Sequence, residues 1–371
     1  MAFLNLSAGL VITTWPERQA DLETIEGWGR QWLVAGMNLY ATDEMPNYPP
    51  HAVVALSPLG IVSHAWAVRA WTILNLGLAF SASTLAVRIV RPGAPWRTIA
   101  LPFLMFLCWG GFRTLLQFSL VTLVFGLLAM KLADRRPALS GLCLGLALMK
   151  PQMSAPFVLW ALFTRRLRIV AIGGMLAIVG LLIFCVRVKA DPIAVVQSYT
   201  QILRSFQMAD GDVMLGLAQL RPLIALAIPA PGFVNAAALT IAIGLLLPIC
   251  LLGFAEGTRR DSLMISAPPL VCVWSLLTFY HLTYGFILLL PVATLLLFED
   301  DPATRNFRRT LFWAMQFALM VDVPGMWRRF APQLFPRQAV QVWAFPSHVD
   351  RVLMVALFGC LWALAAKRRH A

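Results

Sequence analysis

The chain has 371 residues, of which 60% are hydrophobic and only 13% are charged, and its mean hydropathy is +0.75. In soluble domains roughly a quarter of all residues are charged. The composition therefore excludes a soluble globular protein and predicts an all-α, polytopic membrane protein. The formal charge of +13 does not indicate nucleic-acid binding, because the basic residues form short clusters between or after apolar runs, as the positive-inside rule describes.

The first apolar run, residues 3–14, has about half the length of a membrane span. It predicts a first span that is short or truncated. Residues 15–65 follow as a first extracytoplasmic loop, and residues 21–60 within it hold five of the seventeen acidic residues of the chain. This acidic segment is the first place where we expect chemistry.

An amphipathic helix is predicted at the start of this loop, because apolar residues recur at helical spacing. Gly36 is its expected C-terminal end, and Glu26 and Arg30 have the spacing of an i,i+4 ion pair. We expect the helix to lie on the outer membrane surface with its tryptophans at the depth of the lipid headgroups. The apolar residues with this spacing are Leu22, Ile25, Trp28 and Trp32.

The segment N-Y-P-P at residues 47–50 predicts an extended backbone, because residues before proline avoid the helical region. The apolar residues 52–62 that follow are too few to span a bilayer, and Pro58 interrupts them.

The later apolar runs predict about ten crossings in a single transmembrane domain, residues 1–371, with further extracytoplasmic loops at residues 189–232 and 322–351. The first of these loops contains a second amphipathic segment at residues 193–206. The predicted crossings after the first span are residues 66–90, 98–112, 115–132, 169–188, 233–254, 263–279, 283–298, 310–321 and 352–366.

Residues 139–163 have basic clusters on both sides, so both ends are expected in the cytoplasm. The pair Lys150-Pro151 interrupts their middle. Two half-length helices that enter and leave the membrane on one side satisfy both observations. Such a broken, re-entrant hairpin places non-helical backbone at membrane depth, which is tolerated where it lines the protein interior or a wet cavity.

Ionisable residues close to apolar segments are costly and therefore mark candidate sites. Each also has a simpler interpretation. Asp21 fits the cap of the helix that follows equally well, and Lys150 fits a side chain that reaches back to the cytoplasmic face. Arg113 fits an anchor at a helix end, and His281 fits a buried histidine with a satisfied hydrogen bond. Three further cations, Arg187, Arg204 and Arg221, fit headgroup contacts.

The six cysteines all lie in apolar runs without paired spacing, which predicts neither disulfides nor a zinc site. No cofactor is expected, and no carboxylate pair has the spacing of metal ligands. The motifs of soluble enzymes are absent. From the residues alone, the acidic loop and the nearby cations fit a site for a lipid-borne anionic substrate, and they fit the vestibule of a transporter or lipid flippase equally well.

The order of several segments resembles glycosyltransferase family 87. The segments are ADLETIEGWGRQWLVAGMNLY, NYPPHAVVALSPLG, an apolar stretch that begins at Gln117, GLCLGLALMKPQ and HLTYGFILLLP. The resemblance is collinear from residue 21 to about residue 291. It implies a C-type membrane glycosyltransferase fold, as in the family's polyprenyl-phosphate-sugar-dependent enzymes, which include mycobacterial lipid mannosyltransferases. Leu22 and Leu116 depart from the family pattern.

The resemblance implies that Asp21 is the general base that deprotonates the acceptor hydroxyl. His281 is then the first candidate for stabilising the leaving phosphate of the donor, and Arg113 and Lys150 are further candidates. The remaining matched positions, Asn47, Tyr48 and Gln117, would shape the substrate-binding site.

The expected partners are therefore a lipid-linked sugar donor, a lipid or glycan acceptor and the membrane, and no nucleic acid. The basic clusters predict a cytoplasmic C-terminus and place the first loop, with its candidate active site, on the extracytoplasmic side. The expected location is the bacterial inner membrane, as a multi-pass protein. Two alternatives to an inverting, mannosyltransferase-like enzyme remain. One is a transporter or flippase, for which a second broken helix in an inverted repeat would be expected. The other is an inactive member of the family.

Overall fold

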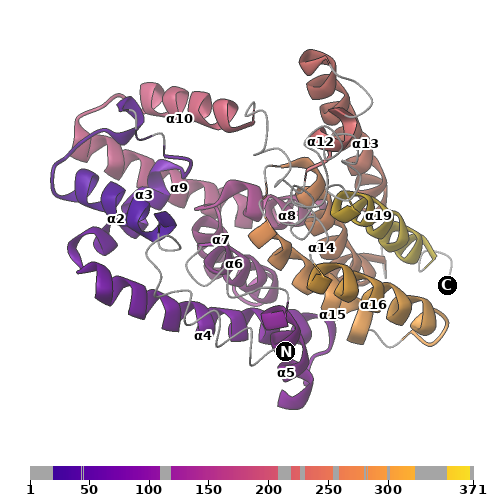
Figure 1. Cartoon of the computed structure of the whole chain (residues 1–371). Coiled ribbons are helices and arrows are strands. Elements are labelled where there is room, and N and C mark those ends of the chain that lie inside the picture. Colours follow the sequence, from indigo (N-terminus) through magenta and orange to yellow (C-terminus); the bar gives the residue numbers. More distant parts are fainter. Residues whose placement is uncertain are drawn as a thin grey trace, which may run out of the picture. The chain divides into compact units, whose positions relative to one another are not determined.

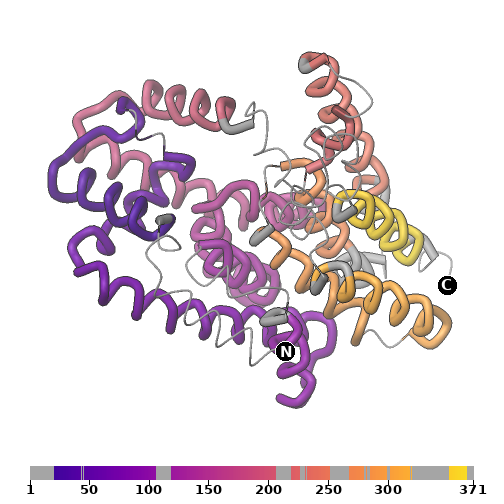
Figure 2. Tube along the Cα trace, viewed as in Figure 1, coloured from indigo at the N-terminus to yellow at the C-terminus, as the bar shows by residue number. Residues whose placement is uncertain are grey.

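The computed structural model describes residues 20–42, 44, 46–108, 118–207, 219–225, 230–253, 259–279, 281, 283–298, 301–321 and 349–367. Every regular element in this part of the chain is a helix, which confirms the predicted all-α class. Figure 1 labels the helices, and the chain can be followed by colour in Figure 2.

Three helices among the described residues are long and apolar enough to cross a membrane: α4 (His64–Val90), α9 (Leu167–Val188) and the segment Gly232–Cys250 of α13 (Pro231–Gly253). All three coincide with predicted crossings. Large apolar side chains on them point outward, and Val186 of α9 is 80% exposed. An apolar surface of this kind fits a lipid-facing helix. Several shorter apolar helices accompany them, and the count of ten crossings stays a prediction.

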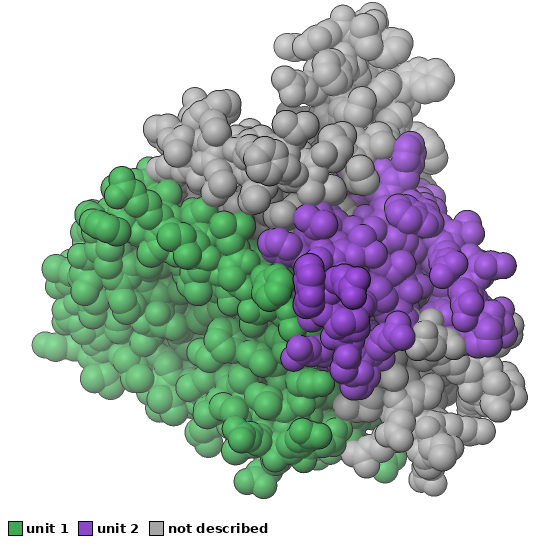
Figure 3. All heavy atoms as spheres, turned by 90° about the horizontal axis from the view of Figure 1, so that it is seen from below, with its two compact units in different colours: residues 1–85, 106–209 green, residues 86–105, 210–371 purple. Residues whose placement is uncertain are grey.

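The chain forms two compact units, shown in green and purple in Figure 3. Unit 1 comprises Met1–Leu85 and Phe106–Ala209, and unit 2 comprises Ala86–Met105 and Asp210–Ala371. The two units would form the predicted single transmembrane domain only if they pack together in the membrane, so the single domain stays a prediction.

Unit 1 begins its described part with α2 (Ala20–Leu33), the predicted amphipathic helix. Gly36 has a φ of +67°, and the amides of Gly36 and Met37 bond back to the last turn of α2, so the expected glycine end is confirmed. The depth of the tryptophans in the membrane stays a prediction, but their rings are covered by protein and not exposed on the helix surface. Trp28 and Trp32 are 6% and 4% exposed, because α3, η2 and α9 supply protein surfaces that cover them.

The N-Y-P-P segment behaves as expected. Pro49 is extended, and Pro50 begins α3 (Pro50–Leu56), where proline is favoured because the first helical amide needs no acceptor. Pro58 then lies near the start of the short helix η3 (Ser57–Ile61). The short helix η2 (Leu39–Ala41) precedes this segment.

Two glycines allow α2 and η3 to touch. A Cβ on Gly60 would lie 2.6 Å from the carbonyl carbon of Gly29 and 2.9 Å from the carbonyl oxygen of Glu26. A Cβ on Gly29 would lie 2.9 Å from the carbonyl oxygen of Ser57. The backbones are therefore in direct contact, which fixes α2 against the chain that leads into α4.

The break predicted at Lys150 is confirmed. It separates α7 (Pro137–Ala147) from α8 (Pro151–Phe163). The start of α7 and the end of α8 lie close together. Asp134, between α6 (Ser119–Leu132) and α7, forms an ion pair of 2.7 Å with Arg166, which lies between α8 and α9. A helix pair whose two ends lie together has the geometry of a hairpin.

The second predicted amphipathic helix is α10 (Pro192–Gln207). It follows α9 after a left-handed turn at Lys189, and its Tyr199 ring packs edge-on against Tyr40 with a centroid separation of 5.8 Å.

In unit 2, α14 contacts α13, α15, η5 and α19 and forms the centre of the packing. The chain segment before α12 is joined to it, because the amide of Leu220 donates to the carbonyl of Leu277 at 2.8 Å. The helices of this unit not bounded above are α5 (Trp96–Cys108, shared with unit 1), α12 (Arg221–Ala225), α14 (Arg259–Thr278), η5 (Thr283–Leu289), α15 (Leu290–Phe298), α16 (Arg305–Val321) and α19 (Val349–Lys367).

Candidate active site

Unit 1 brings together three of the candidate residues that the sequence places far apart. Asp21 lies in the first turn of α2, Tyr48 lies just before α3, and Lys150 lies at the break between α7 and α8. The half-buried Asn47 directly precedes Tyr48. We call Asp21, Tyr48, Lys150 and the contacting Ser119 the acid–lysine cluster.

Lys150 is the centre of this cluster and is only 4% exposed. Its Nζ donates a hydrogen bond of 2.9 Å to the Oγ of Ser119, and it lies 5.8 Å from the centre of the Tyr48 ring, within the range of a cation–π contact. The interpretation that Lys150 reaches back to the cytoplasmic face is wrong, because the side chain ends inside unit 1.

The ring of Tyr48 is held by other aromatic residues. Its centroid lies 5.9 Å from Trp28 and 5.9 Å from Phe118, with edge-on geometry in both pairs. The hydroxyl of Tyr40 donates to the backbone carbonyl of Tyr48 at 2.6 Å. The two prolines after Tyr48 restrict its backbone further, so the ring is a fixed wall beside Lys150.

Asp21 completes the cluster. It is an exposed residue, yet partial desolvation by the surrounding protein raises the pKa of its carboxyl, and the positive charge of Lys150 acts in the opposite direction. The two side chains are therefore close enough to influence each other's charge. A carboxylate beside a cation, with an aromatic wall, is an arrangement that can accept a proton and bind a phosphoryl group.

His281 lies in unit 2, between α14 and η5, and is 2% exposed. Its Nε2 is 3.3 Å from the Oγ of Ser275, and Gly285 packs against its ring. Its predicted role with Asp21 stays a prediction, because the two residues belong to different units. Arg113 and Gln117 lie outside the described residues.

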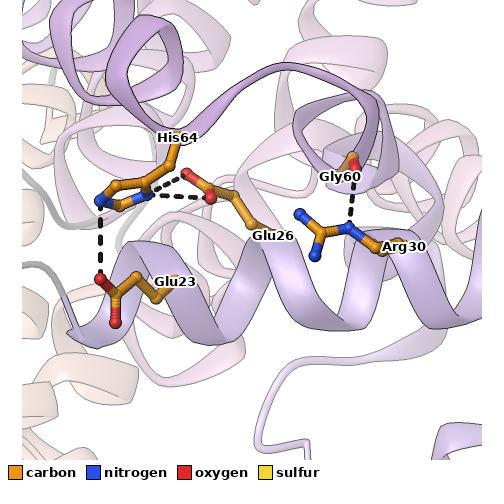
Figure 4. Close-up of polar contacts among 5 residues, drawn as sticks. All are labelled: Glu23, Glu26, Arg30, Gly60 and His64. Carbon is orange, nitrogen blue, oxygen red and sulfur yellow. Dashed lines mark hydrogen bonds and ion pairs between the residues drawn. The ribbon is translucent and has the colours of Figure 1, made fainter.

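A contact that the sequence did not reveal fixes the beginning of α2 (Figure 4). The Nδ1 of His64, the first residue of α4, lies 3.0 Å and 3.1 Å from the two carboxylate oxygens of Glu26, and its Nε2 lies 3.5 Å from Glu23. The predicted pair of Glu26 with Arg30 is wrong: the Nε of Arg30 donates to the carbonyl of Gly60 at 3.3 Å.

Two arginines have protein surroundings that the sequence did not indicate. Arg187 at the end of α9 donates to the carbonyls of Leu33 and Val34 at 2.9 Å and 3.2 Å, and so caps the C-terminus of α2. Arg221 is 8% exposed and is therefore buried within unit 2.

A narrow crevice between α2 and α3, with no room for a water molecule, has the Tyr48 ring as one wall. The residues that line this crevice are Ile25, Trp28, Gly29, Tyr48, Val53 and Leu56.

Among the described residues, no group of three or more histidine, cysteine or carboxylate side chains lies where it could hold a metal ion.

A family model described as glycosyltransferase family 87 matches residues 47–262, more than half of the chain. The match includes Asn47, Tyr48 and Lys150 and leaves Asp21 and His281 outside. No curated protein and no solved structure matches the chain. The expected resemblance is therefore confirmed, and the chain belongs to glycosyltransferase family 87.

Proposed function

We propose that this glycosyltransferase transfers a hexose, in the manner of a mannosyltransferase, from a polyprenyl-phosphate donor to an extracytoplasmic lipid or glycan acceptor. The acid–lysine cluster is the observation that supports the proposal. It joins a carboxylate from α2 to a buried cation from the re-entrant break, inside a protein whose apolar helices associate it with the membrane.

Asp21 acts as the general base in this proposal. Its carboxylate takes the proton of an acceptor hydroxyl while the acceptor oxygen attacks the anomeric carbon of the donor sugar. The bond from that carbon to the phosphate oxygen breaks, and polyprenyl phosphate leaves from the opposite face. One displacement of this kind inverts the configuration of the anomeric carbon.

The leaving phosphate gains negative charge as the bond breaks, so a fixed cation near it lowers the barrier. Lys150 is a candidate cation whose charge acts on Asp21. In this proposal Lys150 contacts the donor phosphate, Tyr48 limits the position of the donor, and Asn47 borders the same site. His281, Arg113 and Gln117 are further candidates for donor contacts.

The base assignment is tested by Asp21→Asn in the full-length protein, reconstituted in lipid nanodiscs with a radiolabelled polyprenyl-phosphate mannose. Transfer to acceptor is expected to fall by at least about 10²-fold, the lower range for loss of a general base. Glu44→Gln is the matched control, because Glu44 is an exposed carboxylate of the same unit, and glutamine keeps the Oε1 that accepts a hydrogen bond of 3.0 Å from Gln31. Equal rates for Asp21→Asn and wild type would refute the assignment of the base.

A further inference from the structure

A concentration of positive charge lies at the end of the helical hairpin opposite the break at Lys150. The chain reaches α7 through residues 131–136 and leaves α8 through residues 164–168, and the ion pair of Asp134 with Arg166 joins these two segments. We call the joined segments the hairpin base. They contain six cations and one acid, so the hairpin base has a net charge of +5.

One arginine of the hairpin base has a structural role, and four others have their charges available. The side chain of Arg166 is only 10% exposed, pairs with Asp134, and lies 5.4 Å from the centre of the Trp160 ring. The other four arginines are exposed, and their side chains form no hydrogen bond or ion pair within the part of the chain that the structure describes. They are Arg135, Arg136, Arg165 and Arg168.

Arg165 occupies a backbone position that does not favour arginine. Its φ is +57°, in the left-handed region that glycine adopts without a steric cost and other residues adopt rarely. A glycine would make the same turn between α8 and α9 more easily. The arginine therefore indicates that a side chain at this position contributes something that the turn itself does not require.

An apolar surface begins directly beside these cations. Leu139 and Leu142 on α7 are exposed, and so is Leu162 near the end of α8. Leu167, the first residue of α9, is 64% exposed, and Met175 is exposed two turns further along that helix. Cations beside exposed aliphatic side chains match a phospholipid, because the phosphate meets the cations while the acyl chains meet the aliphatic groups.

The charge balance distinguishes the hairpin base from the other basic segments. Residues 299–309 contain three acids beside three arginines, and residues 91–97 contain only two arginines. Orientation of a membrane protein requires basic residues on one side, but it does not require their concentration at one place. A soluble anion would use the cations and leave the exposed leucines without a role.

We propose that the hairpin base binds the headgroup of an anionic phospholipid, and that the acyl chains of this lipid lie against the exposed aliphatic side chains of α7 and α9. This inference concerns a lipid that is not a substrate, and it does not depend on the proposed transfer reaction. The bound lipid stabilises the base of the hairpin whose other end carries Lys150.

The test is native mass spectrometry of the full-length protein in detergent, titrated with phosphatidylglycerol or with phosphatidylcholine of the same acyl chains. The wild type is expected to bind phosphatidylglycerol at least about tenfold more tightly, since each basic residue near an anionic lipid surface contributes about fivefold. A fourfold variant should lose this preference. Its changes are Arg135→Gln, Arg136→Gln, Arg165→Gln and Arg168→Gln.

The matched control removes four exposed arginines of unit 2 from basic clusters that are also expected on the cytoplasmic side. The control should keep the preference for phosphatidylglycerol. An unchanged preference in the fourfold variant, an equal loss in the control, or no preference in the wild type would overturn the proposal. The changes in the control are Arg91→Gln, Arg97→Gln, Arg305→Gln and Arg309→Gln.

Arg165→Gly decides the question where the fourfold variant does not fold. Glycine relieves the left-handed backbone, so the thermal midpoint in phosphatidylcholine nanodiscs should stay the same or rise. The affinity for phosphatidylglycerol should nevertheless fall about fivefold, and an unchanged affinity would overturn the proposal. Displacement of the lipid by an equimolar amount of glycerol 3-phosphate would also overturn it, because the site would then be one for soluble anions.

Discussion

Lys150 is a cation in the middle of an apolar run, and burial of such a charge is costly unless nearby groups compensate it. The structure supplies three kinds of compensation. The hydroxyl of Ser119 accepts a hydrogen bond from the Lys150 Nζ, the ring of Tyr48 lies beside the Nζ, and the carboxylate of Asp21 acts on it through its charge. A lysine that needs all three is poorly explained as packing alone, and the proposed donor phosphate gives it a functional reason.

The pH dependence of transfer tests this coupling. Asp21 is active as a base only when ionised, so activity is lost as the pH falls through its pKa. Desolvation raises that pKa by more than the charge of Lys150 lowers it. The acid limb of the pH profile, where activity is lost, should therefore lie above the ordinary pKa of aspartate. Lys150→Met removes the lowering charge and should move the acid limb to still higher pH. Profiles of kcat/KM against pH report this limb for the free enzyme.

The control for this shift is Lys189→Met, which removes the same charge from an exposed position after α9. Its acid limb should match that of the wild type. A limb that moves to lower pH in Lys150→Met, or moves equally in both variants, would contradict a direct influence of Lys150 on Asp21.

At the scale of elements, α2 carries the proposed base and is fixed along its length. His64 binds its first turns, η3 touches its middle through Gly29 and Gly60, and Arg187 caps its end. These contacts come from three other segments of unit 1. The position of Asp21 therefore depends on packing well away from the cluster.

The contact between α2 and η3 is tested by Gly60→Ala. The added methyl group would meet the backbone of Arg30, Gly29 and Glu26, which cannot move as a flexible side chain does. We expect a loss of stability of about 1–3 kcal/mol from overpacking, measured as a lower midpoint in thermal unfolding at a fixed scan rate in nanodiscs.

Gly27→Ala is the control for this experiment, because a Cβ on Gly27 meets no atom within 4 Å. It should leave the midpoint unchanged or raise it, since alanine is favoured over glycine in a helix by about 0.5–1 kcal/mol. A midpoint for Gly60→Ala equal to that of Gly27→Ala would show that the close approach does not limit stability.

The elements that the sequence predicted well are those set by local rules. The helical period and Gly36 gave the extent of α2, two prolines gave the extended turn before α3, and Lys150-Pro151 gave the break between α7 and α8. Each of these signals lies within a few residues of the structure it produces.

The side-chain partners were predicted poorly, because they come from distant parts of the chain. Glu26 binds a histidine 38 residues away, and Trp32 donates to a carbonyl 152 residues away. Lys150 was chosen as a candidate because its charge stands out in an apolar run, whereas Ser119, its hydrogen-bond partner, carried no comparable signal; the role of Lys150 stays a prediction.

At the scale of the whole molecule, the hairpin of α7 and α8 relates the cluster to the membrane. α7 has 11 residues, so it rises about 16 Å, roughly half of a bilayer core of about 30 Å. We expect the Asp134–Arg166 pair on the cytoplasmic side, and this orientation would put the break at Lys150 near mid-depth. A site recessed to this depth suits a donor whose lipid chain stays in the bilayer.

The orientation of α9 decides whether this arrangement is correct. Both ends of α9 carry positive charges, so counting them does not by itself decide which end is cytoplasmic. Arg187 caps α2, and we therefore leave it out of the count. From the remaining asymmetry we expect Arg165, Arg166 and Arg168 on the cytoplasmic side, opposite Lys189. We therefore expect alkaline phosphatase fused after Asp191 to be active, and green fluorescent protein fused after Ala371 to fluoresce. The reverse pair of results would place the acid–lysine cluster on the cytoplasmic side and would exclude an extracytoplasmic acceptor.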